Sequence, residues 1–305
     1  MQKGNPFYDV FIRIVILNYN ESDFTISLIQ QLNNQSFKNF DVIVVDNNST
    51  EEEKNKLMNT LDEGVILICS DKNLGYAGGN NLGLRYENGN VVDYYLVLNN
   101  DLIIDDEKFI EQLIRGMINH KKNKVVASSP IIDTISSGIE VDKQIQVRKL
   151  LSRFETFLIN IPLFNPITKY TIKDKFLYSD KMPFISKYVY CDSINGATFI
   201  IDGNFIKANN YLDEGTFLYY EEIILGKQIQ LAGKTCLLNG YTSVKHLQGV
   251  STKSTSKTSN IRMERFKYQS SLYYLQKYEG LSWLGSKIYI LLNEMVIMLK
   301  KMIRK

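Results

Sequence analysis

Residues 94–101 read YYLVLNND, an apolar and aromatic run that ends in three side chains carrying oxygen. Such a run indicates a buried strand, and in an open α/β sheet ligands bind at the carboxyl ends of the strands. Asn99, Asn100 and Asp101 would offer there the oxygen ligands that Mg²⁺ and Mn²⁺ prefer. Asn and Asp are equally typical of a plain turn after a strand, so the stretch alone leaves both interpretations open.

Strands alternate with helices before this stretch. The sequence predicts strands at residues 13–17, 41–45 and 65–69, with helices at 21–34 and 51–61 between them. Alternation of this kind indicates parallel pairing in a sheet that helices cover on both faces. We therefore predict an α/β fold with a mostly parallel central sheet flanked by helices.

A glycine-rich segment, DKNLGYAGGNN at residues 71–81, is predicted to be a loop that leads into a helix. Glycines here would let the backbone approach a ligand and present amide groups to an anion; a glycine-rich turn with a helix cap is the structural alternative. The dinucleotide fingerprint GxGxxG is absent, which argues against a nicotinamide cofactor. A helix at 106–119 and a strand at 124–129 complete the first half. Residues 133–190, with a helix expected at 143–159, form either the lining of a second pocket or a structural insertion.

The composition, 44% hydrophobic and 23% charged over 305 residues, is typical of a soluble globular protein with one large or two modest domains. The three cysteines have neither zinc-site nor disulfide-framework spacing, which favours a reducing, cytoplasmic setting. The N-terminal apolar stretch lacks a signal-peptide pattern, so secretion is not predicted. Charge is distributed unevenly along the chain. Residues 245–305 carry 12 Lys/Arg and 3 Glu, a net charge of +9. Because the whole chain has a net charge of +3, residues 1–244 carry a net charge of −6. This indicates a catalytic body with a basic tail.

Two adjacent carboxylates, Glu221 and Glu222, interrupt the apolar and aromatic run FLYYEEIIL at residues 217–225. Acidic residues are rarely buried without a partner, and apolar surroundings can raise the pKa of a carboxyl group into the range of a general base. The alternative is a helix N-terminus, where acidic side chains interact favourably with the dipole. His246 follows a predicted strand and is open to a structural role or to metal or phosphate binding, whereas His120 is expected to be solvated at a helix end.

Short motifs stand at the expected strand ends and helix starts: NYN at 18–20, VVDNNST at 44–50, NLGYAGGNNLG at 73–83, YYLVLNND at 94–101, INGATFIID at 194–202, LDEGTFLYYEEIILGKQIQLAGK at 212–234 and KHLQG at 245–249. In this order and spacing they resemble the inverting glycosyltransferases of family 2, especially their rhamnosyltransferase-like branch, over residues 12–252. The resemblance implies a GT-A fold at residues 1–255, with a Rossmann-like nucleotide-binding half at 1–130 and an acceptor-binding half at 131–255. A basic amphipathic helical tail would follow at 256–305.

The resemblance also implies roles for individual residues. Asp101 lies where the family has its DXD motif and, with His246, would bind a divalent cation, Mg²⁺ or Mn²⁺; Asn99 stands in place of the first acid of the motif. Glu222, the second of the carboxylate pair, would be the catalytic base. Acceptor contacts are implied for Gly196, Ala197 and Glu221. Donor contacts are implied for Asn18, Tyr19, Asn20, Asp46, Asn73, Gly75, Gly79, Asn80, Asn99 and Asn100.

The implied reaction moves a sugar from a nucleoside-diphosphate sugar, a UDP- or dTDP-sugar, to a saccharide or lipid-linked saccharide acceptor in cell-surface polysaccharide biosynthesis. The base would take the proton of the acceptor hydroxyl, and the cation, helped by the basic loop at residues 253–257, would stabilise the leaving diphosphate. Two alternatives stay open. One is a non-catalytic sugar-nucleotide-binding or scaffold subunit, which Asn99 in the metal motif allows. The other is a sugar-phosphate nucleotidyltransferase. Such an enzyme would normally have a glycine-rich loop with basic residues after the first strand, where this chain has NYNESD at residues 18–23.

Residues 261–305 predict two helices separated near Gly280. In the second, apolar residues fall at alternating steps of four and three, a heptad-like stripe of Leu284, Ile288, Leu291, Met295, Met298 and Met302. Lys287, Asn293 and Glu294 interrupt the apolar run, so a transmembrane helix is not expected. This helix could pack on the catalytic domain, lie on an anionic membrane surface or form a homodimer. No nucleic-acid-binding module accompanies the basic residues; we expect a cytoplasmic protein, peripheral at the inner face of the cell membrane if the tail binds lipid.

Overall fold

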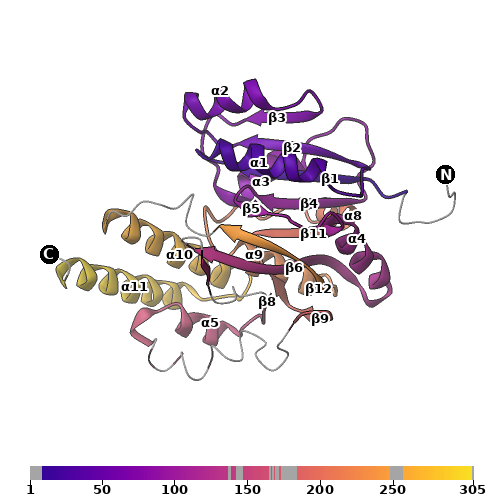
Figure 1. Ribbon diagram of the computed structural model, residues 1–305. Helices are drawn as coiled ribbons and strands as arrows, with labels where there is room; N and C mark the ends of the chain where they lie inside the picture. The colour runs from indigo at the N-terminus through magenta and orange to yellow at the C-terminus, as the bar shows by residue number, and fades with distance from the viewer. Residues whose placement is uncertain are drawn as a thin grey trace.

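Four parallel strands form the first half of the central sheet (Figure 1). β1 (Ile12–Asn18) lies between β2 (Phe40–Asp46) and β4 (Tyr94–Asn99), and β3 (Val65–Cys69) pairs with β2 at the outer edge. The first three strands begin and end within one residue of their predicted bounds. The structure is a computed structural model that describes residues 9–136, 139–141, 147–164, 166, 168, 172, 184–247 and 257–303.

Three helices connect these strands: α1 (Ser22–Asn33), α2 (Glu51–Thr60) and α3 (Gly75–Leu84). The first two agree with prediction, but the predicted glycine-rich loop is largely helical, because α3 begins at Gly75. The reason is close packing of α3 on β1. A Cβ atom added to Gly79 would lie 2.5 Å from Leu17 Cδ1, so a glycine here allows the helix to approach the strand.

Pairing is mixed in the second half of the sheet. β11 (Thr198–Asp202) runs antiparallel to β4 and to β6 (Val125–Ser136), whereas β12 (Thr235–Leu247) runs parallel to β6 and antiparallel to the short β5 (Leu102–Ile103). The predicted parallel arrangement therefore describes the first half of the sheet. The remaining strands are β7 (Ile139–Val141) beside β6, β9 (Tyr188–Cys191) beside β12, and the separate pair β8 (Val147–Arg148) and β10 (Ser193–Ile194).

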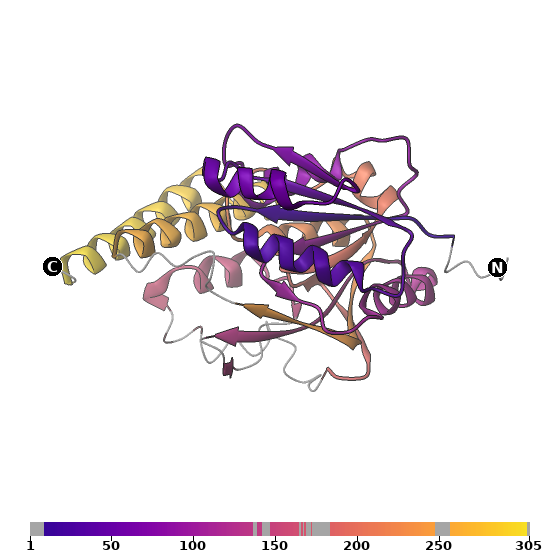
Figure 2. The same cartoon turned by 45° about the horizontal axis from the view of Figure 1, so that its top comes forward.

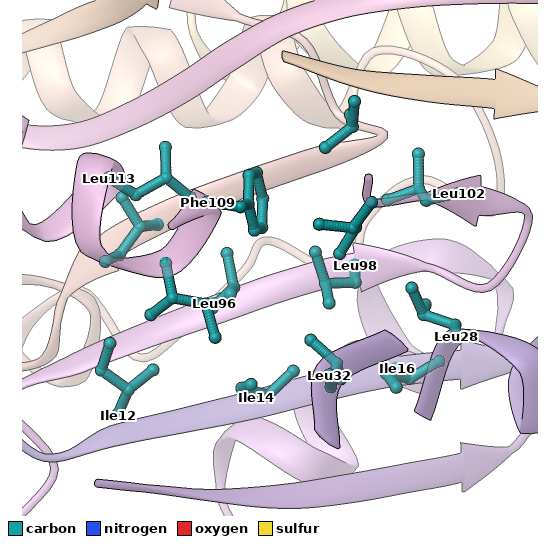
Figure 3. Packing of buried hydrophobic residues seen from close by; sticks show 14 of the residues in the cluster. Ile12, Ile14, Ile16, Leu28, Leu32, Leu96, Leu98, Leu102, Phe109 and Leu113 are labelled. Carbon is teal, nitrogen blue, oxygen red and sulfur yellow. The ribbon is translucent and has the colours of Figure 1, made fainter. Parts of the chain in front are cut away.

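Helices cover both faces of the sheet. On one face, α1 and α4 (Phe109–Asn119) pack against side chains of β1 and β4 (Figure 3). On the other face, α3, α8 (Gly203–Ala208) and α9 (Glu221–Leu231) cover the alternate residues of the same strands. Ile14 faces the first core and Val15 the second. Successive side chains of a strand point to opposite faces, so a strand covered on both sides is a continuous apolar run.

The helix predicted at residues 143–159 is shorter than expected. Residues 142–146 lie outside the described residues, β8 follows them, and the helix α5 spans Arg153–Ile159. A capping box fixes its start: Ser152 Oγ accepts a hydrogen bond from Glu155 N at 3.4 Å, and Glu155 Oε2 accepts one from Ser152 N at 3.0 Å. Two short 3₁₀ helices complete the description, η1 (Lys121–Asn123) and η2 (Pro162–Phe164).

The last two helices, α10 (Lys257–Lys277) and α11 (Trp283–Ile303), lie side by side and extend beyond the sheet (Figure 1, Figure 2). The break near Gly280 agrees with prediction. Tyr289 and Ile297 of α11 are buried in a small core with α10 and η2. The heptad-like stripe lies on a different face and is exposed. Among the described residues, no helix is both long enough and apolar enough to span a bilayer.

Candidate functional site

A cavity of about 540 Å³ opens at the carboxyl ends of β1 and β4. Tyr19 and Asn99 line it at the strand ends, and α10 contributes Arg262, Met263 and Phe266 to its lining. The sequence predicted that the strand ends would meet, but it gave no sign that α10 closes the space above them. Five more residues predicted for the site also line this cavity: Asn73, Gly75, Asn100, Asp101 and His246.

A buried polar network holds the strand ends together behind the cavity. Asn18 Nδ2 donates to Asp46 Oδ1 at 3.0 Å and to Ser49 Oγ at 3.2 Å, and Thr25 Oγ1 donates to Asn18 Oδ1 at 2.8 Å. Asn100 Nδ2 donates to Thr25 Oγ1 at 3.2 Å. Buried polar groups stabilise a fold when their hydrogen bonds are satisfied. Asn18 and Asp46 therefore support the cavity from behind, and the sequence reasoning missed Thr25 and Ser49.

Asn47, which the sequence reasoning also missed, fixes the turn before α3. Its Nδ2 donates to Asn73 Oδ1 at 3.2 Å and to the carbonyl of Gly75 at 3.1 Å. Gly75 has a φ of +73°, and a Cβ atom there would lie 2.2 Å from the carbonyl oxygen of Phe217. That oxygen accepts a hydrogen bond from Tyr76 N at 3.0 Å. The turn before α3 is thus attached to the segment before the carboxylate pair.

Besides Asn18 and Asp46, three more predicted donor residues do not line the cavity. Asn20 has a φ of 56° and its Oδ1 accepts a hydrogen bond from Thr50 N at 2.8 Å, so it closes the turn between two strand ends. Gly79 packs on β1. Asn80 is buried within α3 and donates to the carbonyl of Tyr76 at 3.0 Å. Direct contact of these residues with a donor stays a prediction.

Asp101 and His246 meet at the cavity. His246 Nε2 lies 3.0 Å from Asp101 Oδ1, and both side chains are largely buried. The pairing of β12 with β5 brings them together, because Leu247 N donates to the carbonyl of Asp101 at 2.9 Å. A carboxylate and an imidazole can both bind Mn²⁺, and donor phosphates and water commonly complete such a shell, so the pair fits a divalent cation. No cluster of three or more His, Cys, Asp or Glu that could hold a metal ion occurs in the described part of the chain.

The carboxylate pair stands at the start of α9, after an unusual turn. Tyr219 and Tyr220 both have positive φ, 73° and 75°, a conformation that bulky residues adopt only when surrounding contacts hold it. The Tyr220 hydroxyl contacts Asn160, and its ring lies 5.6 Å from that of Tyr274. This agrees with the helix N-terminus that the sequence left open for Glu221.

Glu221 has a buried carboxylate. Its Oε1 has no hydrogen-bond partner among the described residues. Burial and the negative charge of Glu222 raise the pKa of Glu221 to about 8. The hydroxyl of Tyr76 donates to the carbonyl of Gly196 at 2.5 Å, and these residues line a small hollow with both glutamates. Ala197 is buried and its carbonyl accepts a hydrogen bond from Asn99 N at 2.8 Å, which joins the predicted acceptor segment to the end of β4.

Glu222 lines a second cavity, of about 450 Å³, which shares Tyr219 and Met263 with the first. Arg148 Nη1 donates to Glu222 Oε1 at 2.5 Å, and both side chains are mostly buried. Arg148 reaches this position because β8 pairs with β10, whose Ser193 donates to the carbonyl of Glu222 at 2.7 Å. The sequence reasoning missed Arg148, since no local motif surrounds it.

His120 differs from expectation. It was expected to be solvated, but its Nδ1 lies 2.5 Å from the Tyr190 hydroxyl and its ring packs at 4.6 Å from that of Tyr188. Burial lowers the pKa of His120. Neither cavity includes it, so its role is structural packing between α4 and β9. The basic loop predicted at residues 253–257 lies outside the described side chains.

Comparison with known protein families finds a match over residues 13–181 to the model described as Glycosyl transferase family 2. The low-salt glycan biosynthesis hexosyltransferase Agl10 of Haloferax volcanii is 26% identical over 213 residues, 70% of this chain and 59% of that protein. The amylovoran biosynthesis glycosyltransferase AmsB of Erwinia amylovora is 34% identical over 88 residues, 28% of this chain and 29% of that protein. The chain thus spans less than two thirds of the length of either relative.

Among solved structures, that of GalNAc-T7 with UDP, GalNAc and Mn²⁺ resembles this chain with a TM-score of 0.57 and 14% identity. The match covers 90% of this chain and 52% of the other. At this identity the likeness concerns the fold, and it confirms the expected GT-A architecture.

Proposed function

Because the chain belongs to glycosyl transferase family 2, we propose that it is an inverting glycosyltransferase. Its donor would be a nucleoside-diphosphate sugar, linked to UDP or dTDP. Its acceptor would be a saccharide or lipid-linked saccharide of a cell-surface polysaccharide, met in the cytoplasm at the inner face of the membrane. The relatives named for glycan and amylovoran biosynthesis support this context, and the UDP of the structural neighbour supports the donor class.

The observation that carries the proposal is the pair of adjoining cavities. The first, at the strand ends, contains Asp101 and the turn at Gly75; the second contains Glu222; and Tyr219 belongs to both. A donor in the first cavity would present its sugar toward Tyr219, and an acceptor in the second would place a hydroxyl beside Glu222. Two bound substrates held in contact are what a group transfer needs.

Glu222 would act as the general base. As the acceptor oxygen bonds to the anomeric carbon, the bond from that carbon to the diphosphate breaks and the hydroxyl proton passes to the carboxylate of Glu222. Attack opposite the leaving diphosphate inverts the anomeric centre. In the structure Arg148 already donates a hydrogen bond to Glu222 Oε1. The acceptor hydroxyl must therefore bind the other carboxylate oxygen, Oε2, or displace the guanidinium.

Asp101 and His246 would hold the divalent cation. When bound, such a cation supplies positive charge that stabilises a leaving diphosphate. Arg262 lines the same cavity and contributes a fixed positive charge from α10. The Mn²⁺ of the structural neighbour supports this assignment.

Donor binding tests the first half of the proposal. We would titrate UDP- and dTDP-sugars by calorimetry, with and without Mn²⁺ or Mg²⁺. Binding of one donor is expected to need the metal and to weaken in Asp101→Asn. Asp105→Asn is the matched control, because Asp105 pairs with Lys245 at 2.6 Å beside His246 but does not line the cavity. Failure of every donor to bind a folded protein would refute the proposal.

Turnover tests the second half. Glu222→Gln is expected to lower transfer by about 10² to 10⁴ with donor binding unchanged. Glu214→Gln is the matched control, because Glu214 is also an ion-paired glutamate, 2.6 Å from Arg85, outside both cavities. Full turnover in Glu222→Gln would refute the base assignment. Donor binding without any transfer by the wild type would instead identify a non-catalytic binding subunit.

A further inference from the structure

The outward face of α11 is a continuous apolar surface. We define it as the residues Trp283, Leu284, Ile288, Leu291, Met295, Met298, Leu299 and Met302, all of which are exposed. Leu291 is 67% exposed and Met302 is 72% exposed. Side chains three and four positions apart lie on one side of a helix, so these residues form one surface. Contiguous exposed apolar surfaces mark binding sites.

The helix holds this face outward because its other side is fixed. Tyr289 is fully buried, and its hydroxyl lies 2.6 Å from Ser271 Oγ of α10. Val296 and Ile297 are buried beside it. Rotation of α11 to hide the outward face would therefore expose a packed core. The intramolecular packing considered for the tail uses the inner face and leaves the heptad-like stripe without a partner in the described residues.

The charged residues of α11 indicate which kind of partner covers the outward face. The only acidic residue of α11, Glu294, points to α10, where its carboxylate accepts from Arg265 Nη2 at 2.9 Å and from the Tyr268 hydroxyl at 2.5 Å. Lys287 is exposed beside the outward face, with its Nζ 5.6 Å from the centre of the Trp283 ring. The sequence after Met298 adds Lys301, Arg304 and Lys305, whereas Lys300 pairs with Glu264 of α10 at 2.7 Å.

We propose that α11 docks on an anionic lipid surface, with its outward face in the acyl boundary and its axis in the plane of the membrane. An apolar face with tryptophan and lysine at its border and no exposed acid is the pattern of interfacial helices, and anionic lipids attract the basic end. The helix of 21 residues would lie along about 31 Å of the surface.

A second copy of the chain is the competing partner. In an antiparallel pairing of two outward faces, Lys287 of one copy would lie near residues 299–301 of the other, a segment whose sequence contains Lys301 next to Lys300, which already pairs with Glu264. In a parallel pairing the two Lys287 residues would face each other. Like charges brought together destabilise an interface. An anionic bilayer complements the positive charges of α11, so these charges favour a lipid surface over a second copy of the chain.

Docking would also place the catalytic cavities near the membrane. One side of α10 lines both cavities through Met263, and another packs against α11 through Tyr268 and Leu275. A lipid-linked acceptor would then reach the cavity from the surface on which the protein lies. This last step rests on the proposed function, whereas membrane binding itself does not.

The chain contains a single tryptophan, Trp283, and it belongs to the outward face. Its fluorescence therefore reports docking directly, without donor or acceptor. We would titrate the protein with vesicles of phosphatidylcholine alone and of phosphatidylcholine with an equal amount of phosphatidylglycerol. A saturable blue shift with the anionic vesicles, weakened by 0.5 M salt as screening requires, is the expected result.

The double variant Leu291→Gln/Met298→Gln is expected to weaken binding to anionic vesicles at least about tenfold, because two large apolar side chains no longer transfer from water. Leu231→Gln/Met58→Gln is the matched control: Leu231 is 68% exposed and Met58 is 54% exposed, and neither belongs to α11. The control is expected to bind like the wild type, since it changes the same residue types at another exposed surface.

Three results would overturn the proposal. One is equal binding to neutral and anionic vesicles, and another is vesicle binding that leaves the Trp283 emission unchanged. The third is absence of binding to anionic vesicles. If the protein then dimerises in analytical ultracentrifugation and Leu291→Gln/Met298→Gln abolishes the dimer, the outward face belongs to a second copy. Because no substrate is present, these outcomes are separate from a failure of the proposed transferase activity.

Discussion

Replacing Glu221 with glutamine is expected to change how stability depends on pH. In the folded protein, burial and the neighbouring charge of Glu222 raise the pKa of Glu221 from the model-compound value of 4.5 to about 8. The backbone amides of Glu221 and Tyr219 and the positive charge of Arg148 oppose this rise but do not cancel it. Burial and the charges of the two glutamates raise the pKa of the Tyr76 hydroxyl, so this neighbouring group adds no compensating charge.

The sign and size follow from the two pKa values. Below pH 4.5 the carboxyl group is protonated in both the folded and the unfolded chain, and its contribution to stability is fully present. Between pH 4.5 and 8 only the unfolded chain ionises freely, so stability falls as pH rises. The loss between pH 5 and pH 8 is about 3 kcal/mol, from 1.36 kcal/mol per pKa unit. A glutamine has no proton to lose and is expected to avoid this loss.

Urea denaturation at pH 5, 6, 7, 8 and 9 measures the free energy of unfolding of the wild type and of Glu221→Gln. The difference between variant and wild type is expected to grow in favour of the variant by about 3 kcal/mol from pH 5 to pH 8, whatever constant offset the substitution adds. Glu63→Gln, at an exposed position, controls for the loss of one charge. If the free energy of unfolding of the wild type and of Glu221→Gln changed with pH in the same way, the raised pKa of Glu221 would be refuted.

Two further substitutions test the packing and the donor turn. Leu98→Ala, in the core between β4 and α4, is expected to lower the free energy of unfolding by about 2–5 kcal/mol in urea, whereas Val91→Ala, 81% exposed, should change it by less than about 0.5 kcal/mol. Gly75→Ala is expected to weaken donor binding in calorimetry and lower the melting temperature, because its Cβ would meet the Phe217 carbonyl. Gly89→Ala has a similar φ of +85° without close neighbours and should cost only about 1 kcal/mol with donor binding intact.

The first half of the fold was predictable because its signals are local. A parallel strand covered on both faces is a short continuous apolar run, and β1 to β3 match their predicted bounds within one residue. The glycine-rich segment was misjudged for a physical reason: glycine has low helix propensity, but close packing of Gly79 on Leu17 favours the helix α3. Tertiary contact outweighed local preference there.

The site was predictable from local physical signals mainly where it follows strand ends. Tyr19, Asn99 and Asp101 line one cavity, as the carboxyl ends of parallel strands require. The roles of Asn47, which lies within the motif at residues 44–50, and of Arg148 could not be predicted, because their partners are distant in sequence: Asn47 bonds a turn 26 to 28 residues away and Arg148 bonds a carboxylate 74 residues away. No periodicity or motif encodes such pairs.

The two glutamates show why an adjacent pair of identical residues need not share a role. Both begin α9, yet Glu221 Oε1 is buried without a hydrogen-bond partner among the residues that the structure describes, while Glu222 borders a cavity and pairs with Arg148. The left-handed turn at Tyr219 and Tyr220 sets this difference, since it fixes which residue of the first helical turn faces inward. That backbone is unfavourable for tyrosine and is held by contacts from α5 and α10, through Asn160 and Tyr274. The helix α10, against which the proposed membrane helix α11 packs, therefore also helps to orient the proposed base.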